Sequence, residues 1–405
     1  MKKAMTLALG IVTSVGGFFD AGNIATCVQA GASFRLQLLW AMILATILVI
    51  FLIEMAGRFA AVSGKAVPDA IREHFGFTFW SVPFLLLTVM HVLVLAVEIG
   101  GIAFALHLVT GLPLPLLVVP VAVLIWIFLW RSTFSTIENS TSLLGLVTLC
   151  FAVAAWRHHP PLRQVLAGSL PSLPSHDALH YWFIAVSLIG AVIAPYLLYF
   201  YSSGAVEDEW DASYVPVNRV VAVVGMGFGS IISIGAIIVA GAVLGPRGIH
   251  VNDYHQAALM LTEAFPYWGY VLFAVSVAIA CLGAAVEVAL ATSYTVAQTF
   301  GWNWGEDLRP TEDARFCLVY TGAILLASLI MVAGVEPLKL TVVTMALNAA
   351  VLPVVAFPML LLMNDRKLLG DHANGVFSNV VTVATVAITF LLAIVSIPLT
   401  FLGGS

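Results

Sequence analysis

The sequence predicts an all-α polytopic membrane protein, and three observations support that fold class. Of the 405 residues, 61% are hydrophobic and only 9% are charged, and the mean hydropathy is +1.05. Apolar runs long enough to cross a hydrocarbon core about 30 Å thick recur along the whole chain. Two of these runs contain a helix-breaking patch halfway through, around Asp20 and around Ala194. Because so few charges cannot cover the surface of a soluble protein, a soluble multidomain chain is excluded.

Eleven helices are expected from the apolar runs and from the Gly, Pro and charged residues that bound them. They lie at about 6–31 (interrupted near 20–23), 36–61, 78–108, 113–130, 139–157, 181–204 (interrupted near 194–196), 217–244, 267–298, 315–334, 338–363 and 376–402. A polar loop over 158–180 separates the fifth helix from the sixth. Since this leaves no room for an extramembrane domain, the chain 1–405 is predicted to be a single transmembrane domain.

The basic residues predict the orientation of the chain in a plasma or inner membrane. With the N-terminus in the cytoplasm, eleven of the 16 Lys and Arg residues fall on the cytoplasmic side and five fall outside. An odd number of spans then places the C-terminus outside. The net charge of -5 is spread thinly, so the lipid bilayer is the expected partner and nucleic acid is not. The chain is expected to be monomeric.

The two interrupted helices occupy corresponding positions in two five-helix halves of the chain. The halves cover about 6–157 and 181–363, and the helix at 376–402 is an additional element. Since five is odd, the second half begins on the opposite side of the membrane from the first, which predicts an inverted repeat. In such an arrangement the binding site lies at the midplane of the membrane, where the two broken helices meet.

Asp20 and Asn23 are the first candidates for that binding site. A carboxylate near the centre of a membrane helix is costly, so it usually faces a partner or a water-filled path. With the backbone carbonyls freed around Asp20 and Ala194, the two side chains form an all-oxygen set, which hard divalent cations prefer. The alternative is that Asp20 only caps the second half-helix. Capping alone does not account for the matching break in the sixth helix.

The first-helix segment reads Asp20-Ala21-Gly22-Asn23-Ile24 and is followed by several further motifs. These are Gln29-Ala30-Gly31-Ala32, Leu38-Leu39-Trp40, the segment from Arg58 to Lys65, Glu98-Ile99-Gly100 and the segment from Asn364 to Asp371. Together they resemble the Nramp (natural resistance-associated macrophage protein) metal transporters, whose usual first-helix form is Asp-Pro-Gly-Asn. The resemblance covers nearly the whole chain.

The resemblance implies a LeuT-like fold, with ten core helices in two inverted repeats, broken helices one and six, and an eleventh helix. It also implies a divalent metal ion as the transported substrate, with no cofactor. The implied metal site consists of Asp20, Asn23, the carbonyl of Ala21 and helix six, where Ala194 offers its backbone carbonyl.

Helix six departs from the family pattern, because the usual Met-Pro-His is Ala194-Pro195-Tyr196 here. The family's methionine supplies a thioether, a soft ligand that favours Mn²⁺ and Fe²⁺. Ala194 lacks that group and leaves room for a partly hydrated ion, and Mg²⁺ sheds its water reluctantly. This points to the Nramp-related magnesium transporters, with Mg²⁺ as the first substrate and Mn²⁺ also accepted. The alternative is that Ala194 is neutral packing and the substrate remains Mn²⁺.

The proton route of the family is also depleted. Two of its titratable positions, a histidine in helix six and an aspartate in helix three, hold Tyr196 and Leu95 here, and only Glu98 remains. Tyrosine titrates near 10 and leucine does not titrate, so neither replaces a group that works near neutral pH. Weak or absent proton coupling is therefore expected. The alternative is a proton-coupled Mn²⁺/Fe²⁺ importer.

Two further titratable residues and one pair of charged residues have two interpretations each. Glu287 lines the intracellular half of the path, or it is paired with a neighbouring helix or protonated. His91 belongs to a residual proton path, or it is a satisfied histidine facing the bundle. Glu54 and Arg58, four residues apart, form an ion pair that is structural or that latches a gate.

The remaining polar clusters and the cysteines have simpler interpretations. The acidic run at 207–211 and the segment at 250–255, with its two histidines, are expected to be solvated loops. The four cysteines lie singly in or beside apolar runs and are expected to be inert.

Two other classes of function are open at this point. The same architecture also carries organic solutes, and the space left by Ala194 suits a larger substrate. A membrane-bound enzyme lacks support, because the sequence has no nucleophile–base set, no His/Glu metal motif and no phosphate-binding loop on a strand.

Overall fold

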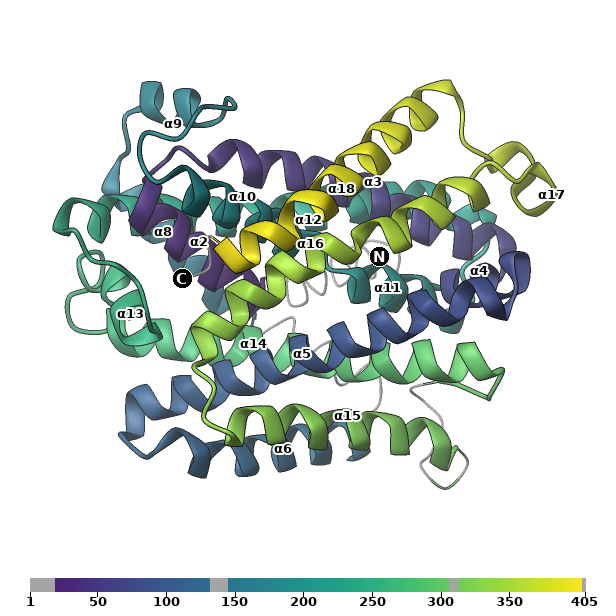
Figure 1. Cartoon of the computed structure of the whole chain (residues 1–405), viewed down its shortest axis with the longest axis horizontal. Helices are drawn as coiled ribbons and strands as arrows, with labels where there is room; N and C mark the ends of the chain where they lie inside the picture. Colours follow the sequence, from purple (N-terminus) through teal and green to yellow (C-terminus); the bar gives the residue numbers. More distant parts are fainter. Residues whose placement is uncertain (1–18, 132–144, 306–310, 312, 403–405) are drawn as a thin grey trace, which may run out of the picture.

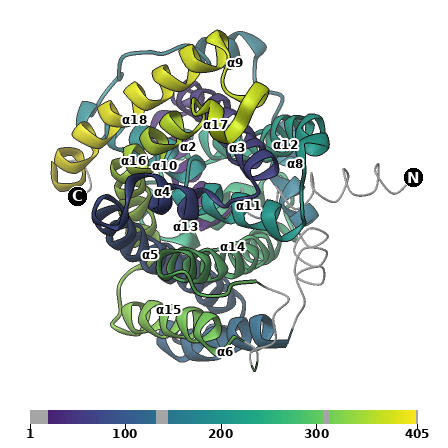
Figure 2. The same ribbon diagram turned by 90° about the vertical axis from the view of Figure 1, so that its right-hand side faces the viewer.

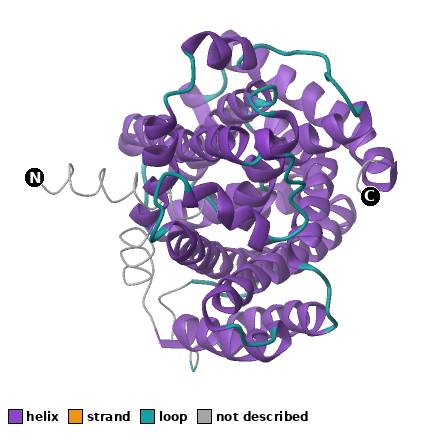
Figure 3. Cartoon of the chain, turned by 90° about the vertical axis from the view of Figure 1, so that its left-hand side faces the viewer, coloured by secondary structure: helices purple, strands orange, loops and turns teal. Residues whose placement is uncertain are grey.

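A computed structural model of the chain describes residues 19–131, 145–305, 311 and 313–402. The described residues form helices and loops without a strand (Figures 1 and 3). Nine of their segments are long and apolar enough to cross a membrane. They are α3 (Leu39–Ser63), α5 (Phe77–Thr110), α6 (Leu114–Arg131), α10 (Ala178–Val192) joined to α11 (Pro195–Glu207), α12 (Val215–Val243), α14 (Gly269–Phe300), α15 (Ala314–Val332), α16 (Pro337–Leu362) and α18 (Val376–Leu402).

These nine segments match nine of the eleven predicted helices, which confirms the all-α polytopic fold. The other two predicted helices lie partly outside the described residues. Of the first, the structure describes α2 (Ala21–Phe34), and of the fifth it describes a short 3₁₀ turn and α8 (Leu149–His158). The boundaries of the two repeats, 6–157 and 181–363, stay predictions.

The helices form two groups that lie side by side. In one group, α5 and α14 pack along each other and against α6 and α15. In the other, α2, α3, α10, α11 and α12 pack together. Figure 1 shows the first group in its lower half, and Figure 2 shows the same separation from the side. Helix α16 contacts α2 and α10 on one side and α5 on the other, and α18 packs on α16.

Short helices occupy segments that the hydropathy pattern predicts as loops. They are α4 (Val67–Phe75), α9 (Leu162–Gly168), α13 (Tyr254–Thr262) and α17 (Arg366–Leu369). The expectation of a solvated loop at 250–255 is therefore wrong in part, because Asp253 caps α13 by accepting the Gln256 N–H at 2.9 Å. The acidic run at 207–211 is also not wholly a loop, since Glu207 is the last residue of α11 and accepts the hydroxyl of Tyr294.

The two helix breaks lie slightly earlier than predicted. In the sixth helix, Ile193 and Ala194 separate α10 from α11, and Pro195 begins α11, where its missing N–H costs nothing. In the first helix, Phe19 and Asp20 are not helical and α2 begins at Ala21, so residues 21–23 of the predicted interruption are helical, and the residues before 19 lie outside the described part. The physical reason is the side chain of Asp20, which caps the new helix and so starts it immediately.

Helices α2 and α12 cross at glycines, with their backbones in direct contact. A Cβ on Gly31 would lie 2.7 Å from the Cβ of Ala240, 2.8 Å from the backbone nitrogen of Gly241, and closer still to the carbonyl of Ile237. Close backbone approach at small residues is the usual way in which membrane helices associate. Gly31 therefore sets the position of the helix that carries Asn23.

We expect the Gly31→Ala substitution to destabilise the protein. The added methyl has no room, and overpacking of this kind costs about 1–3 kcal/mol. The matched control is Gly227→Ala on α12, because no atom of the described chain lies within 4 Å of a Cβ there. Thermal unfolding of the detergent-solubilised variants should give a lower Tm for Gly31→Ala and an equal or higher Tm for Gly227→Ala. Equal values for both variants would contradict the close crossing.

Candidate metal site

Asp20 lies at the start of α2, buried in the middle of the bundle with 1% of its surface exposed. Its Oδ1 accepts the backbone N–H of Asn23 at 2.8 Å, which is the geometry of an N-cap. A helix that begins in the middle of a membrane has N–H groups that water cannot satisfy, so a side-chain cap is required there. Capping is thus one role of Asp20. The cap uses only Oδ1, so Oδ2, which lies beside the sixth helix, can also contact a ligand.

Asn23 connects the two broken helices. It is fully buried, and its side-chain nitrogen lies 3.4 Å from Oδ1 of Asp20 and 3.5 Å from the carbonyl oxygen of Ala191. Ala191 belongs to the last turn of α10, whose carbonyls have lost their helical partners at the break. By contrast, the carbonyl of Ala194 accepts the N–H of Leu197 at 3.2 Å. The helix-six oxygen that faces Asn23 in this structure is that of Ala191, and the carbonyl of Ala194 as a metal ligand stays a prediction.

Ala21 is the first residue of α2, so its carbonyl belongs to the first helical turn rather than to an unwound segment. Its N–H donates to Oε2 of Glu98 at 3.2 Å. Glu98, on α5, is fully buried and interacts electrostatically with Asp20 and with Glu287. Two carboxylates thus meet the N-terminal end of α2, where a helix dipole favours negative charge.

Tyr196, in the first turn of α11, donates its hydroxyl to Oδ2 of Asp20 at 3.3 Å. Sequence reasoning treated Tyr196 as the replacement of a proton-carrying histidine and did not place it on the carboxylate of the site. The side chain is 1% exposed and also interacts electrostatically with Glu98 and Glu287. Tyr196 therefore brings a neutral donor to the one carboxylate oxygen that the cap does not use.

Glu287 and His91 lie at the edges of this cluster. Glu287, on α14, is 7% exposed and close enough to Glu98 and Tyr196 for their charges to interact. His91 lies on α5 two turns before Glu98 and is 1% exposed, and neither ring nitrogen has a hydrogen-bond partner among the described residues. Both interpretations of His91 stay predictions.

Two more groups at the site have no signal in the sequence. The thioether of Met345, on α16, lies beside Gly22 and Asp20. The thiol of Cys281, on α14, packs at Gly101 next to the methyl of Ala21. All four cysteines are buried and free. Within the described part of the chain, no three His, Cys, Asp or Glu side chains converge as a closed metal cage, so any cation held here is held by a mixed set of side chains and backbone oxygens.

On the side of the site where α11 ends, a hydrogen bond joins the two helix groups. The side chain of Gln298 on α14 donates to the hydroxyl of Ser203 on α11 at 2.8 Å. The indole of Trp80 donates to Thr299 at 2.7 Å, which ties α5 to α14 at the same level. On the other side, Gln29 donates to the carbonyl of Val251 at 3.3 Å. Hydrogen bonds therefore join α14 to α11 on one side of the site and α2 to the loop before α13 on the other.

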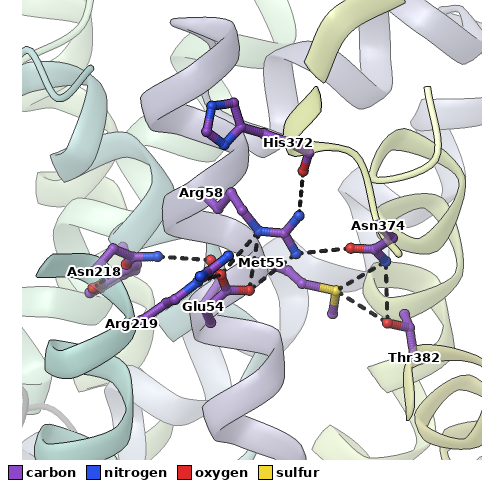
Figure 4. Close-up of polar contacts among 9 residues, drawn as sticks. Glu54, Met55, Arg58, Asn218, Arg219, His372, Asn374 and Thr382 are labelled. Carbon is purple, nitrogen blue, oxygen red and sulfur yellow. Dashed lines mark hydrogen bonds and ion pairs between the residues drawn. The ribbon is translucent and has the colours of Figure 1, made fainter. Parts of the chain in front are cut away.

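The predicted pair of Glu54 and Arg58 forms the centre of a polar network in the C-terminal half of α3 (Figure 4). Arg58 is 4% exposed, and its Nε lies 3.0 Å from Oε1 of Glu54. Its other nitrogens donate to the carbonyl of His372 and to the side chain of Asn374, in the connection before α18. The side chain of Asn218, on α12, donates to the Glu54 carbonyl at 2.9 Å. One guanidinium therefore joins α3 to the segment that precedes the last helix, which favours the structural interpretation.

Comparisons with known proteins agree with this architecture. The model of the natural resistance-associated macrophage protein-like (Nramp) family matches residues 10–398. The metal transporter Nramp3 of Oryza sativa subsp. japonica is 24% identical over 397 residues, which cover 92% of this chain and 70% of that protein.

Solved structures share the fold at lower sequence identity. The manganese transporter of Eremococcus coleocola, in complex with an aromatic bis-isothiourea compound, superposes with a TM-score of 0.83 at 20% identity, over 98% of this chain and 87% of that chain. MhsT in complex with L-phenylalanine has a TM-score of 0.66 at 13% identity, over 97% and 98% of the two chains. Mhp1, a nucleobase-cation-symport-1 family transporter with bromovinylhydantoin bound, has a TM-score of 0.64 at 16% identity, over 97% and 92%. The fold is LeuT-like, as predicted.

We expect Arg58→Ala to destabilise the protein far more than Arg219→Ala. Both guanidinium groups contact Glu54, but the side chain of Arg58 is 5% exposed and that of Arg219 is 63% exposed. Loss of a buried ionic partner costs about 3–5 kcal/mol, whereas an exposed pair contributes about 0–1 kcal/mol. Denaturant unfolding in detergent micelles measures both changes. Equal losses of stability would contradict the structural role of the Arg58 network.

Proposed function

The chain belongs to the Nramp family, and we propose that it carries divalent metal ions across the membrane by alternating access, with Asp20 and Asn23 as the side-chain ligands. One observation carries the proposal: a buried carboxylate and a buried amide face each other and the open end of α10 where both broken helices are interrupted. The manganese transporter structure, with the same fold, supports a divalent metal as the cargo. The metal ion is a substrate, and the proposal includes neither a cofactor nor an enzymatic activity.

The proposed ion is Mg²⁺, with Mn²⁺ also accepted. The ligands from helices one and six are all oxygen atoms, contributed by Asp20, Asn23 and the carbonyls of the broken helices around Ala191 and Ala194. Hard cations prefer such a set, and Mg²⁺ usually keeps several of its waters when it binds. A helix-six side chain as small as that of Ala194 suits an ion that arrives partly hydrated.

The proposed transport is weakly coupled or uncoupled to protons. Tyr196 uses its hydroxyl to donate to Asp20, and Leu95, fully buried on α5, has no proton to exchange. Glu98 accepts a backbone N–H from α2, and His91 has no hydrogen-bond partner among the described residues to pass a proton to. The hydrogen bond that Tyr196 donates to Asp20 and the one that Glu98 accepts from α2 both lie at the site itself. Ions would then move down their own electrochemical gradient.

In the proposed mechanism, the ion reaches Asp20 and Asn23 from outside, and the group that contains α2, α10 and α11 rocks against α5 and α14 to release it inside. The contacts that close the cytoplasmic half, such as Gln298 to Ser203, must then open. We propose a monomer with the N-terminus in the cytoplasm and the C-terminus outside. This orientation follows the distribution of Lys and Arg.

A small organic solute is the competing cargo. MhsT and Mhp1 share the fold and were solved with L-phenylalanine and with bromovinylhydantoin. The dense packing at the site favours an ion instead, because Asp20, Asn23, Ala194 and Tyr196 are each 3% exposed or less.

Asp20→Ala should abolish metal binding. Calorimetric titration of the purified protein with Mg²⁺ and with Mn²⁺ should detect binding to the wild type and none to the variant, because the site loses its only charged ligand. Glu263→Gln, which removes an exposed carboxylate paired with Arg247, is the control and should bind as the wild type does. Absence of binding to the wild type would overturn the metal proposal. Binding that survives in Asp20→Ala would overturn the site.

Uptake into proteoliposomes tests the ion and the coupling together. With a pH-sensitive dye inside the vesicles, Mn²⁺ should enter without acidification of the lumen. An excess of Mg²⁺ at millimolar concentration should block that entry, because both ions use the same oxygen ligands. Acidification that follows metal entry would identify a proton-coupled importer. Mn²⁺ uptake that is indifferent to Mg²⁺ would rule out the hard-ion site.

A further inference from the structure

A thioether from a third helix lies beside the broken start of α2. Met345, on α16, is fully buried. Its Sδ lies 2.5 Å from the position that a Cβ on Gly22 would occupy, and Oδ1 of Asp20 lies 3.1 Å from the same position. The sulfur atom and the carboxylate oxygen therefore approach the same face of residue 22, and the thioether can lie this close because that residue is a glycine without a side chain.

The packing of α16 against α10 holds Met345 in this position. A Cβ on Gly190 would lie 2.9 Å from the backbone nitrogen of Ala349 and even closer to the carbonyl of Met345, so the two backbones touch there. Gly190 directly precedes Ala191, whose carbonyl faces Asn23. The side-chain amide of Asn348 lies 3.6 Å from the Met345 sulfur and donates to it. Met345 is thus fixed between the ends of both broken helices.

We propose that Met345 supplies the soft ligand of the metal site, from α16 rather than from the sixth helix, and so determines which divalent ions bind most tightly. This inference rests on the proposed function, because it assumes that the ion binds at Asp20. A thioether adds affinity for soft ions such as Cd²⁺ and, less strongly, for Mn²⁺, but adds little for Mg²⁺. The site then has an oxygen part, sufficient for Mg²⁺, and a sulfur part that extends its range to softer ions.

The competing explanation is that Met345 only fills space, as methionine does in many cores. The two roles predict different patterns across a series of ions. A packing defect weakens the binding of every ion by a similar factor, whereas loss of a soft ligand weakens binding in the order of ion softness. The ratio of the Kd values for soft and hard ions therefore distinguishes a soft ligand from a packing residue, whereas the Kd for one ion does not.

The test compares Met345→Leu with Met359→Leu in the full-length protein. Leucine keeps much of the volume and removes the sulfur, and Met359 is a 1% exposed methionine of the same helix, 14 positions further along. Calorimetric titration with Cd²⁺, Mn²⁺ and Mg²⁺ should show at least a tenfold weaker Kd for Cd²⁺ in Met345→Leu, a smaller loss for Mn²⁺, and a change of less than twofold for Mg²⁺. Met359→Leu should leave all three values within twofold of the wild type.

Two outcomes for Met345→Leu would overturn the inference while the proposed function stands. One is an equal loss of affinity for Cd²⁺ and for Mg²⁺, and the other is no loss of affinity for either ion. No binding of any ion to the wild type would instead overturn the proposed function itself. X-ray absorption of Cd²⁺ on the wild-type protein gives a second readout that does not depend on how the variant folds. A sulfur neighbour that is also present when Cys281 is replaced by Ser supports the role of Met345, and a shell of oxygen and nitrogen alone contradicts it.

Discussion

The cap that Asp20 places on α2 is the interaction on which the rest of the site depends. A helix that stops and restarts inside a bilayer leaves backbone groups that lipid cannot satisfy, so the break needs a polar side chain at that point. Asp20 meets this need through Asn23, and Glu98 meets it through the N–H of Ala21. The register of α2 follows from the cap. It brings Asn23 to the end of α10 and places Gly22, rather than a bulkier residue, under Met345.

The distribution of charge among the described residues supports the proposed cation site at Asp20. Among the buried side chains of the described residues, Arg58 is the only Lys or Arg, and it pairs with Glu54 far from the break. Within the described part of the chain, the polar side chains seen around Asp20 and Glu98 are therefore neutral donors and other carboxylates, including Glu287 beside Glu98. Buried carboxylates without a basic partner are costly in a membrane. In the proposed function, a divalent ion at Asp20 would supply the missing positive charge.

Much of this arrangement follows from the sequence, because hydropathy and helix-breaking residues act locally. Short stretches of sequence are enough to predict the positions of the helices and the two breaks. They are also enough to select Asp20 and Asn23 as candidate ligands. The missed groups come from contacts between helices: the carbonyl of Ala191 and the thioether of Met345 depend on the register of α10 against α16. Hydrophobic periodicity carries no information on that register, and an apolar helix such as α16 is nearly uniform around its axis. The backbone contact at Gly190, on which the register depends, has no distinct sequence signal.

The same atoms join the candidate site to the two groups of helices that must move. Glu98 holds the first turn of α2 to α5, and Tyr196 holds α11 to Asp20. A cation at Asp20 needs carboxylate lone pairs and therefore competes with the Tyr196 hydroxyl for Oδ2. It also screens the repulsion between Asp20 and Glu98, which strengthens the contact between the groups. The hydrogen bonds of Glu98 and Tyr196 would then link binding of an ion to the relative position of α2, α11 and α5. Alternating access requires a link of this kind between binding and conformation.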